Sequence, residues 1–284
     1  MPLDHFSAFS FVDRITSIDR NGEIKGYFRI PKHLDHFPQS LVAEAIGQLA
    51  AWFAMSTLNF TSRPVAALAG EIKYYKESKP GQILSLIAKI ESCDYDFVTY
   101  SGIAFSGGHL LLELKDCTGV MLPQAEFDDP KVVENQFYLL KTIGARENRL
   151  AVAPYILGID MHSDTVGTLE GSLIIPKQAD FFVDHFPKKP VFPATLLIYA
   201  LTSMVMENTN SITSRPSTVK VSISAIRKVK VRSWISPGEH VRLKAKALPA
   251  ESTPNSLKLT ANLSGKLVAS ATLQLTDIES PPMA

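Results

Sequence analysis

Cysteine is scarce in this chain: Cys93 and Cys117 are the only two among 284 residues. Two thiols cannot build the framework of a small disulfide-stabilised scaffold, so the sequence excludes that class of secreted protein. Two free thiols fit a reducing compartment, and a single disulfide between them is also compatible with the sequence.

An excess of charge of one sign is also lacking. The 29 Lys and Arg residues nearly balance the 28 Asp and Glu residues, which leaves a formal net charge of +1. A dedicated nucleic-acid binder usually has a basic excess. We therefore expect no nucleic-acid partner.

Targeting segments and long apolar runs are missing as well. Residues 1–6 contain no basic patch leading into an apolar stretch, so they do not resemble a signal peptide. The longest apolar stretches, 41–58 and 191–206, carry polar residues and fall short of the ~20 apolar residues of a membrane span. We expect no membrane span, a cytoplasmic location, and two buried helices at these stretches.

The common signatures of cofactor sites are absent from the sequence. It contains no Gly-rich phosphate loop, no serine nucleophile elbow and no spacing typical of metal ligands. The sequence therefore predicts neither a metal nor another cofactor.

What the chain does contain is an internal repeat. With 45% hydrophobic and 20% charged residues it has an ordinary globular composition, and its length allows one large domain or two of roughly 140 residues. Five landmarks recur in the same order, which indicates two copies of one fold. The pairs are Gly22–Gly26 with Gly167–Gly171, Ile30–Lys32 with Ile175–Lys177, Asp35–Pro38 with Asp184–Pro187, an apolar helical run after each, and Lys79–Gln82 with Ser236–Glu239.

The repeat divides the chain into residues 1–123, a crossover linker at 124–153, and residues 154–284. In each copy one long apolar helix, near 40–58 or 194–207, is followed by stretches that alternate with period two, as expected for antiparallel strands. The second helix is apolar almost all round and must be enclosed. We predict an α+β fold with two antiparallel sheets, joined edge to edge, each wrapped around one central helix.

The segment Phe182–Leu196 resembles the active-site segment of a known family. Its residues FVDHFPKKPVFPATL are similar to the pattern F-x-G-H-F-P-x-x-P-V-x-P-G-V-L of 3-hydroxyacyl-acyl-carrier-protein dehydratases of the FabA/FabZ type. Glu44–Gln48 matches that family's helix motif E-A-x-A-Q with one Gly for Ala, and Val12–Ile15 resembles its early strand. The resemblance implies a double hot-dog fold.

Each copy retains a different half of the family's motif. The family's His and Glu stand 14 residues apart, but Tyr199 occupies that place after His185, and only eight residues separate His36 from Glu44. The family builds its site from His of one subunit and Glu of the other. The resemblance therefore implies one complete pair, His185 with Glu44, and a second pair, His36 with Tyr199, that lacks a carboxylate.

The resemblance implies reversible dehydration of a 3-hydroxyacyl thioester, bound to acyl carrier protein or CoA. His185 would take the α-proton, and Glu44, with its pKa raised by burial, would protonate the departing hydroxyl. Backbone N–H groups of Ala194 and Thr195, after Pro193, would hold the thioester oxygen. Ala194 stands where the family has Gly, which adds a methyl group beside the substrate.

Further residues near these motifs receive less specific roles. Gln48 belongs to the predicted substrate-binding set, although a hydrogen bond to the backbone or to Glu44 is the simpler role for it. His36 is expected to be structural, and Tyr199 and Ser203 to pack in the core.

Two other functions stay open at this stage. A hot-dog thioesterase would act on the same ligand, but the His-Phe-Pro loop argues against it. A non-catalytic acyl-binding protein is compatible with the decay of one half-site.

The basic strand with Lys228, Lys230 and Arg232 is either a solvated sheet face or a carrier-docking patch. Because one chain holds both halves, a monomer suffices for the site, and a homodimer is compatible with it.

Overall fold

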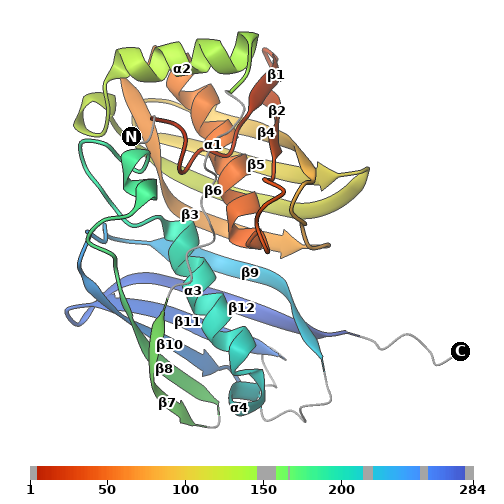
Figure 1. The fold of residues 1–284 in the computed structure, drawn as a ribbon, viewed down its shortest axis with the longest axis vertical. Helices are drawn as coiled ribbons and strands as arrows, with labels where there is room; N and C mark the ends of the chain where they lie inside the picture. Colours follow the sequence, from red (N-terminus) through yellow and green to blue (C-terminus); the bar gives the residue numbers. More distant parts are fainter. Residues whose placement is uncertain (1–4, 146–157, 166, 214–219, 250–254, 279–284) are drawn as a thin grey trace, which may run out of the picture.

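Twelve antiparallel strands form one continuous sheet in the computed structural model, which describes residues 5–145, 158–165, 167–213, 220–249 and 255–278. The strand order is β1-β2-β4-β5-β6-β3-β9-β12-β11-β10-β8-β7 (Figure 1). The strands are β1 Arg14–Ile18, β2 Glu23–Arg29, β3 Ser62–Tyr74, β4 Ile83–Cys93, β5 Phe97–Ser106, β6 His109–Pro123, β7 Ile159–Thr165, β8 Thr168–Ile174, β9 Val221–Val231, β10 His240–Ala247, β11 Ser256–Leu263 and β12 Lys266–Asp277.

The strands follow the period-two pattern of the sequence. In β10 the side chains of Val241, Leu243 and Ala245 are buried, whereas those between them are exposed or half-buried. This alternation turns one face of the sheet toward the helices. Gly102 in β5 lets α1 approach closely, because a Cβ there would collide with Ile46.

The sequence predicted two sheets joined edge to edge, and the joint is the pairing of β3 with β9, which makes the two halves one continuous sheet. Leu68 pairs with Lys230 and Ile72 with Ile226, so backbone hydrogen bonds join the β1–β6 half to the β7–β12 half. The two edge strands satisfy each other's backbone groups, which leaves neither half with an open edge at the joint. The result is one sheet of two six-stranded halves.

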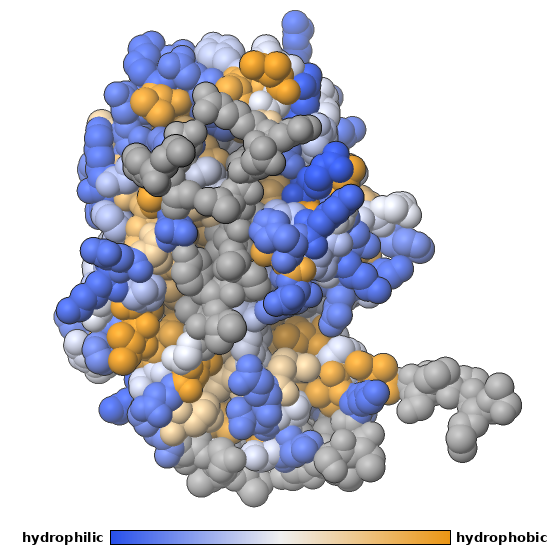
Figure 2. Space-filling view, in the orientation of Figure 1, coloured by the Kyte–Doolittle hydropathy of each residue, from blue (hydrophilic) through white to orange (hydrophobic). Residues whose placement is uncertain are grey.

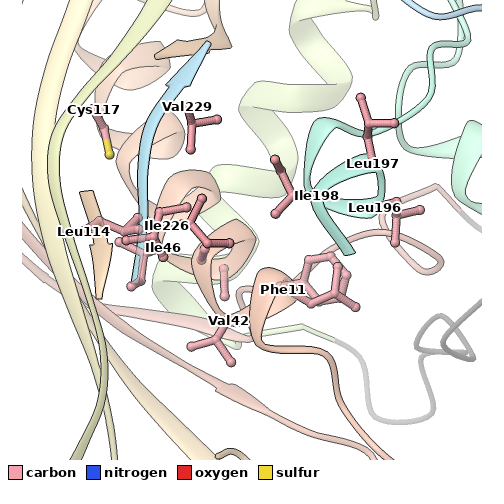
Figure 3. Packing of buried hydrophobic residues seen from close by; sticks show 14 of the residues in the cluster. Phe11, Val42, Ile46, Leu114, Cys117, Leu196, Leu197, Ile198, Ile226 and Val229 are labelled. Atoms are coloured by element: carbon pink, nitrogen blue, oxygen red, sulfur yellow. The ribbon is translucent and has the colours of Figure 1, made fainter. Parts of the chain in front are cut away.

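The two long helices are present where the sequence predicted them. Helix α1 spans Gln39–Thr57 and packs on strands β2 to β6, while α3 spans Ala194–Glu207 and packs on β8 and β10. Both lie on the same face of the curved sheet and contact each other (Figure 1). Apolar side chains of α1, α3 and β9 gather in one core, as Ile46, Ile198 and Val229 show in Figure 3.

The shorter helices lie around this core. Helix α2, Pro130–Thr142, begins after Asp129, whose side chain accepts a hydrogen bond from the N–H of Lys131. Its apolar side packs against α1 and β1. The 3₁₀ turns η1 and η2 span Gln124–Glu126 and Asp180–Val183, and α4 spans Thr209–Thr213. Of the predicted linker 124–153, residues after 145 lie outside the described residues, as does the predicted start of the second copy at 154.

The surface is predominantly hydrophilic with scattered apolar patches on the face seen in Figure 2. Over the described residues, no helix has the length and apolar character needed to cross a bilayer.

Candidate active site

A largely apolar cavity of about 230 Å³ lies between α1, α3 and the β3–β9 joint. Both halves of the chain line it. Glu44 and Gln48 come from α1, His185 from the loop before α3, and Ala194 and Thr195 from the first turn of α3. The structure therefore brings His185 and Glu44, 141 positions apart in sequence, to the same cavity.

His185 is held in one orientation by its neighbours. Its Nδ1 lies 3.0 Å from the carbonyl oxygen of Val191. A carbonyl only accepts, so Nδ1 carries the proton and the lone pair stays on Nε2. The ring stacks on Phe186 with centroids 4.1 Å apart and meets the edge of Phe9 at 5.4 Å.

Burial keeps this imidazole neutral. It lowers the pKa of His185 from 6.5 to about 4, the charge of Arg63 adds to the lowering, and the hydrogen bond to Val191 opposes it. A neutral ring at neutral pH offers Nε2 as a proton acceptor.

Glu44 is the acidic group of the cavity. Its Oε2 accepts a hydrogen bond from the Thr195 hydroxyl and its Oε1 one from the Gln48 amide, both at 2.9 Å. Burial raises the pKa of this carboxyl, and the hydrogen bonds from Gln48 and Thr195 and the charge of Arg63 partly offset the rise. Burial thus favours the protonated form that a general acid needs.

Helix α3 begins at the cavity. Pro193 is its N-cap, and the N–H groups of Leu196 and Leu197 bond back to the Pro193 carbonyl at 3.1 Å. The N–H groups of Ala194 and Thr195 precede these and belong to the first turn, where backbone donors have no intrahelical acceptor. Of the predicted substrate-binding residues, Ala194, Thr195 and Gln48 line the cavity, whereas Pro193 does not.

Gln48 uses its amide to fix the N-terminal segment. Its Oε1 accepts from the N–H of Phe11 at 2.8 Å, and its Nε2 donates to the Phe9 carbonyl at 3.0 Å and to Glu44. With both ends of the amide engaged, Gln48 orients Glu44 and the segment that covers it.

The two residues of the second pair, His36 and Tyr199, lie within hydrogen-bond distance of each other. Nε2 of His36 lies 2.8 Å from the Tyr199 hydroxyl, and the imidazole is exposed. Neither residue lines the cavity, and neither does Ser203.

Asp184 is a residue of this site that sequence reasoning missed. Its buried carboxylate accepts three backbone hydrogen bonds, from the N–H groups of Phe6 at 2.6 Å, Ala8 at 2.8 Å and Phe9 at 2.7 Å. Together with Gln48 it holds the N-terminal segment against the cavity. The signal in the sequence was an aspartate directly before His185, where the family pattern has glycine.

Arg63 is the second residue that was missed. It is half-buried and lines the cavity, and desolvation lowers the pKa of its guanidinium to about 10, against the opposing effect of Asp128 and Glu44. Its Cζ lies 3.9 Å from the centre of the Phe186 ring. A single cation directly before the apolar run 64–69 was the available signal.

Comparison with known proteins places the chain in a family. A family model described as ApeI-like, ApeI dehydratase, matches residues 161–271, which include His185 but not Glu44. The 3-hydroxyacyl-[acyl-carrier-protein] dehydratase FabZ of Methylobacterium sp. (strain 4-46) is 32% identical over 120 residues, 41% of this chain and 69% of that protein. The chain belongs to the FabZ-type dehydratase family. The FabZ of Streptococcus mutans is 34% identical over 96 residues, 33% of this chain and 66% of that relative.

Solved structures similar to this chain share its fold. The dehydratase domain from the CurF module of curacin polyketide synthase aligns with a TM-score of 0.58 at 12% identity, covering 96% of this chain and all of that domain. A putative oleoyl thioesterase from Lactobacillus plantarum aligns with a TM-score of 0.61 at 12% identity, covering 92% and 98%. At this identity they show the fold alone, which is of the hot-dog type.

Proposed function

We propose that this chain dehydrates a 3-hydroxyacyl thioester to a trans-2-enoyl thioester, and hydrates it in reverse, with His185 as base and Glu44 as acid. The observation that carries the proposal is their position: a neutral imidazole and a half-buried carboxyl, one from each half of the chain, line a single largely apolar cavity.

The chemistry follows from these two groups. Nε2 of His185 takes the α-proton, which leaves negative charge on the thioester oxygen. The N–H groups of Ala194 and Thr195, aided by the positive end of α3, stabilise that charge. Glu44 delivers its proton to the 3-hydroxyl, which departs as water, and the double bond forms between the α- and β-carbons. Hydration uses the same groups in reverse.

We further propose that the chain is a fused pair of hot-dog units, residues 1–123 and 154–284, joined by 124–153. Each unit contributes half of one site, so a single chain suffices. The pairing of β3 with β9 and the hydrogen bond from Thr195 to Glu44 support this arrangement. The expected substrate carrier is acyl carrier protein or CoA, and a cytoplasmic location remains a prediction.

A comparison of two products tests this function against its alternatives. The protein is incubated with 3-hydroxyacyl and enoyl thioesters, and the enoyl absorbance and the free thiol are followed separately. Interconversion without thiol release supports a dehydratase. Thiol release would identify a thioesterase, and binding without either change, across several chain lengths and carriers, would identify an acyl-binding protein.

A further inference from the structure

Arg63 is an unusual residue to find in this cavity. Its Nε has no hydrogen-bond partner among the described residues, and its guanidinium rests on ring faces, with Cζ 3.9 Å from the centre of Phe186 and 5.8 Å from that of Phe127. Arg63 itself is half-buried, but its Nε is a buried donor without an acceptor among the described residues, and such a donor is costly. The cost is offset if a ligand supplies acceptor oxygens.

The position of Arg63 relative to the reacting groups follows from the ring stack. The imidazole of His185 and the guanidinium of Arg63 each lie about one stacking distance from the Phe186 ring, at 4.1 and 3.9 Å. Two groups this close to one ring centre cannot share a face, so they occupy opposite faces. Arg63 is therefore two ring spacings from the proposed base, too far to contact the reacting carbons but close enough to meet a neighbouring part of the same substrate.

The cavity has an open side and a closed side. Of its lining residues, Leu68 and Trp234 are 45% and 37% exposed, whereas Val98, Leu114 and Cys117 are at most 3% exposed. Phe127, on which Arg63 also rests, packs against Trp234 with ring centres 5.9 Å apart. Arg63 thus belongs to the open side, and the apolar closed side suits the acyl chain.

We propose that Arg63 binds the amide carbonyl oxygens of the pantetheine arm that carries the thioester, an assignment that rests on the proposed dehydratase function. The arm enters from the open side, and its first amide follows the thioester sulfur by two methylene groups. A guanidinium offers five donors in a planar fork, which suits carbonyl oxygens in an otherwise apolar passage. Arg63 is then a residue that distinguishes pantetheine-borne thioesters from simple ones.

Two unreactive ligands test this assignment by calorimetry on the full chain. Octanoyl-pantetheine and the S-propyl thioester of octanoic acid share the acyl group, but only the first carries amides. We expect Arg63→Met to weaken octanoyl-pantetheine binding about tenfold to a hundredfold, as for a lost hydrogen bond to a charged group, and to leave the S-propyl ester unchanged. Arg29→Met, on the exposed end of β2, is the matched control and should change neither. Equal losses with both ligands, or no loss, would overturn the assignment.

A third ligand tests whether Arg63 instead binds acceptor oxygens at the far end of the acyl chain. The S-propyl monothioester of octanedioic acid carries a carboxylate at the far end of its acyl chain. If Arg63→Met weakens this ligand and leaves octanoyl-pantetheine unaffected, the guanidinium faces the acyl end and the assignment is wrong.

Thermal unfolding separates a binding role from a structural one. Nε of Arg63 has no acceptor among the described residues, and Met can keep an apolar contact with the Phe186 ring. Arg63→Met should therefore leave the Tm nearly unchanged, and a clear fall in Tm would indicate a structural role instead. None of the ligands can be dehydrated. Arg63-dependent binding in a protein without turnover would refute only the dehydratase function, while turnover with Arg63-independent binding would refute only this assignment.

Discussion

The Thr195 hydroxyl hydrogen-bonds Oε2 of Glu44 at 2.9 Å, and so links the first turn of α3 to α1. The same turn supplies the backbone N–H groups proposed to hold the thioester oxygen. One side chain therefore fixes the distance between the proposed acid and the proposed oxyanion donors. The bond also lowers the pKa of Glu44, against the larger effect of burial.

Replacing Thr195 by Val should move the pH profile of the reaction. With the hydrogen bond gone, the pKa of Glu44 rises further, so the acid form persists to higher pH and the alkaline limb of kcat/KM shifts upward. We also expect a loss of activity of roughly tenfold from the misplaced carboxyl. Thr202→Val, in the same helix but bonded to the Ile198 carbonyl, is the control and should leave the limb in place. An unchanged alkaline limb of kcat/KM in Thr195→Val would contradict the role given to this hydrogen bond.

The two histidine loops should differ sharply in their effect on turnover. His185→Ala removes the base and should lower kcat by about 10²–10⁴-fold, and Glu44→Gln should be similarly severe because an amide cannot deliver the proton. His36→Ala removes only an exposed contact with Tyr199 and should leave turnover nearly unchanged. The rates are compared on one 3-hydroxyacyl thioester, with circular dichroism to verify the fold. Equal rates for His185→Ala and His36→Ala would show that the chemistry lies elsewhere.

The lowered pKa of the His185 imidazole also predicts a pH dependence of stability. Its pKa falls from 6.5 to about 4 on folding, so between these values the unfolded chain binds the extra proton. The free energy of unfolding should therefore decrease as the pH falls from about 6.5 to about 4, with at most a few kcal/mol from this group. Urea titrations of the wild type and His185→Ala across this range measure the effect. The variant should lose less stability, and parallel curves would contradict the prediction.

Asp184→Asn should release the N-terminal segment from the cavity. An amide presents N–H groups where the carboxylate accepts from Phe6, Ala8 and Phe9, so some of these donors lose their partner at a cost of about 1–3 kcal/mol. Hydrogen exchange should accelerate at these amides, and KM should rise because the segment lines the cavity. Asp35→Asn, at the exposed matching position of the first copy, should change neither. Unaltered exchange in Asp184→Asn would show that Gln48 alone holds the segment.

Much of the fold was predictable because its signals are local. A run of apolar residues long enough for a helix, and alternation with period two in the strands, are properties of neighbouring residues. They predicted α1 and α3 to within a residue. The repeat added the correspondence between the halves, and the motifs around His185 and Glu44 pointed to the pair that the structure brings to one cavity.

Other features depend on contacts between distant residues, which no local pattern encodes. The sequence predicted that the sheets join edge to edge, but only the structure identified β3 and β9 as the two edge strands that satisfy each other's hydrogen bonds. The Gln48 amide hydrogen-bonds the backbone of Phe9 and Phe11 because the N-terminal segment lies against α1.

The sequence alone determined the residue types of the site and the two-copy order that separates them. Only the tertiary structure decided that Asp184 reaches the N–H groups of residues 176 and 175 positions away. It alone also placed the Arg63 guanidinium on the Phe186 ring, with no partner for Nε among the described residues. Both outcomes arise from packing. A carboxylate or guanidinium acquires its role from the donors, acceptors and rings that the fold encloses with it, and these come from segments far apart in the chain.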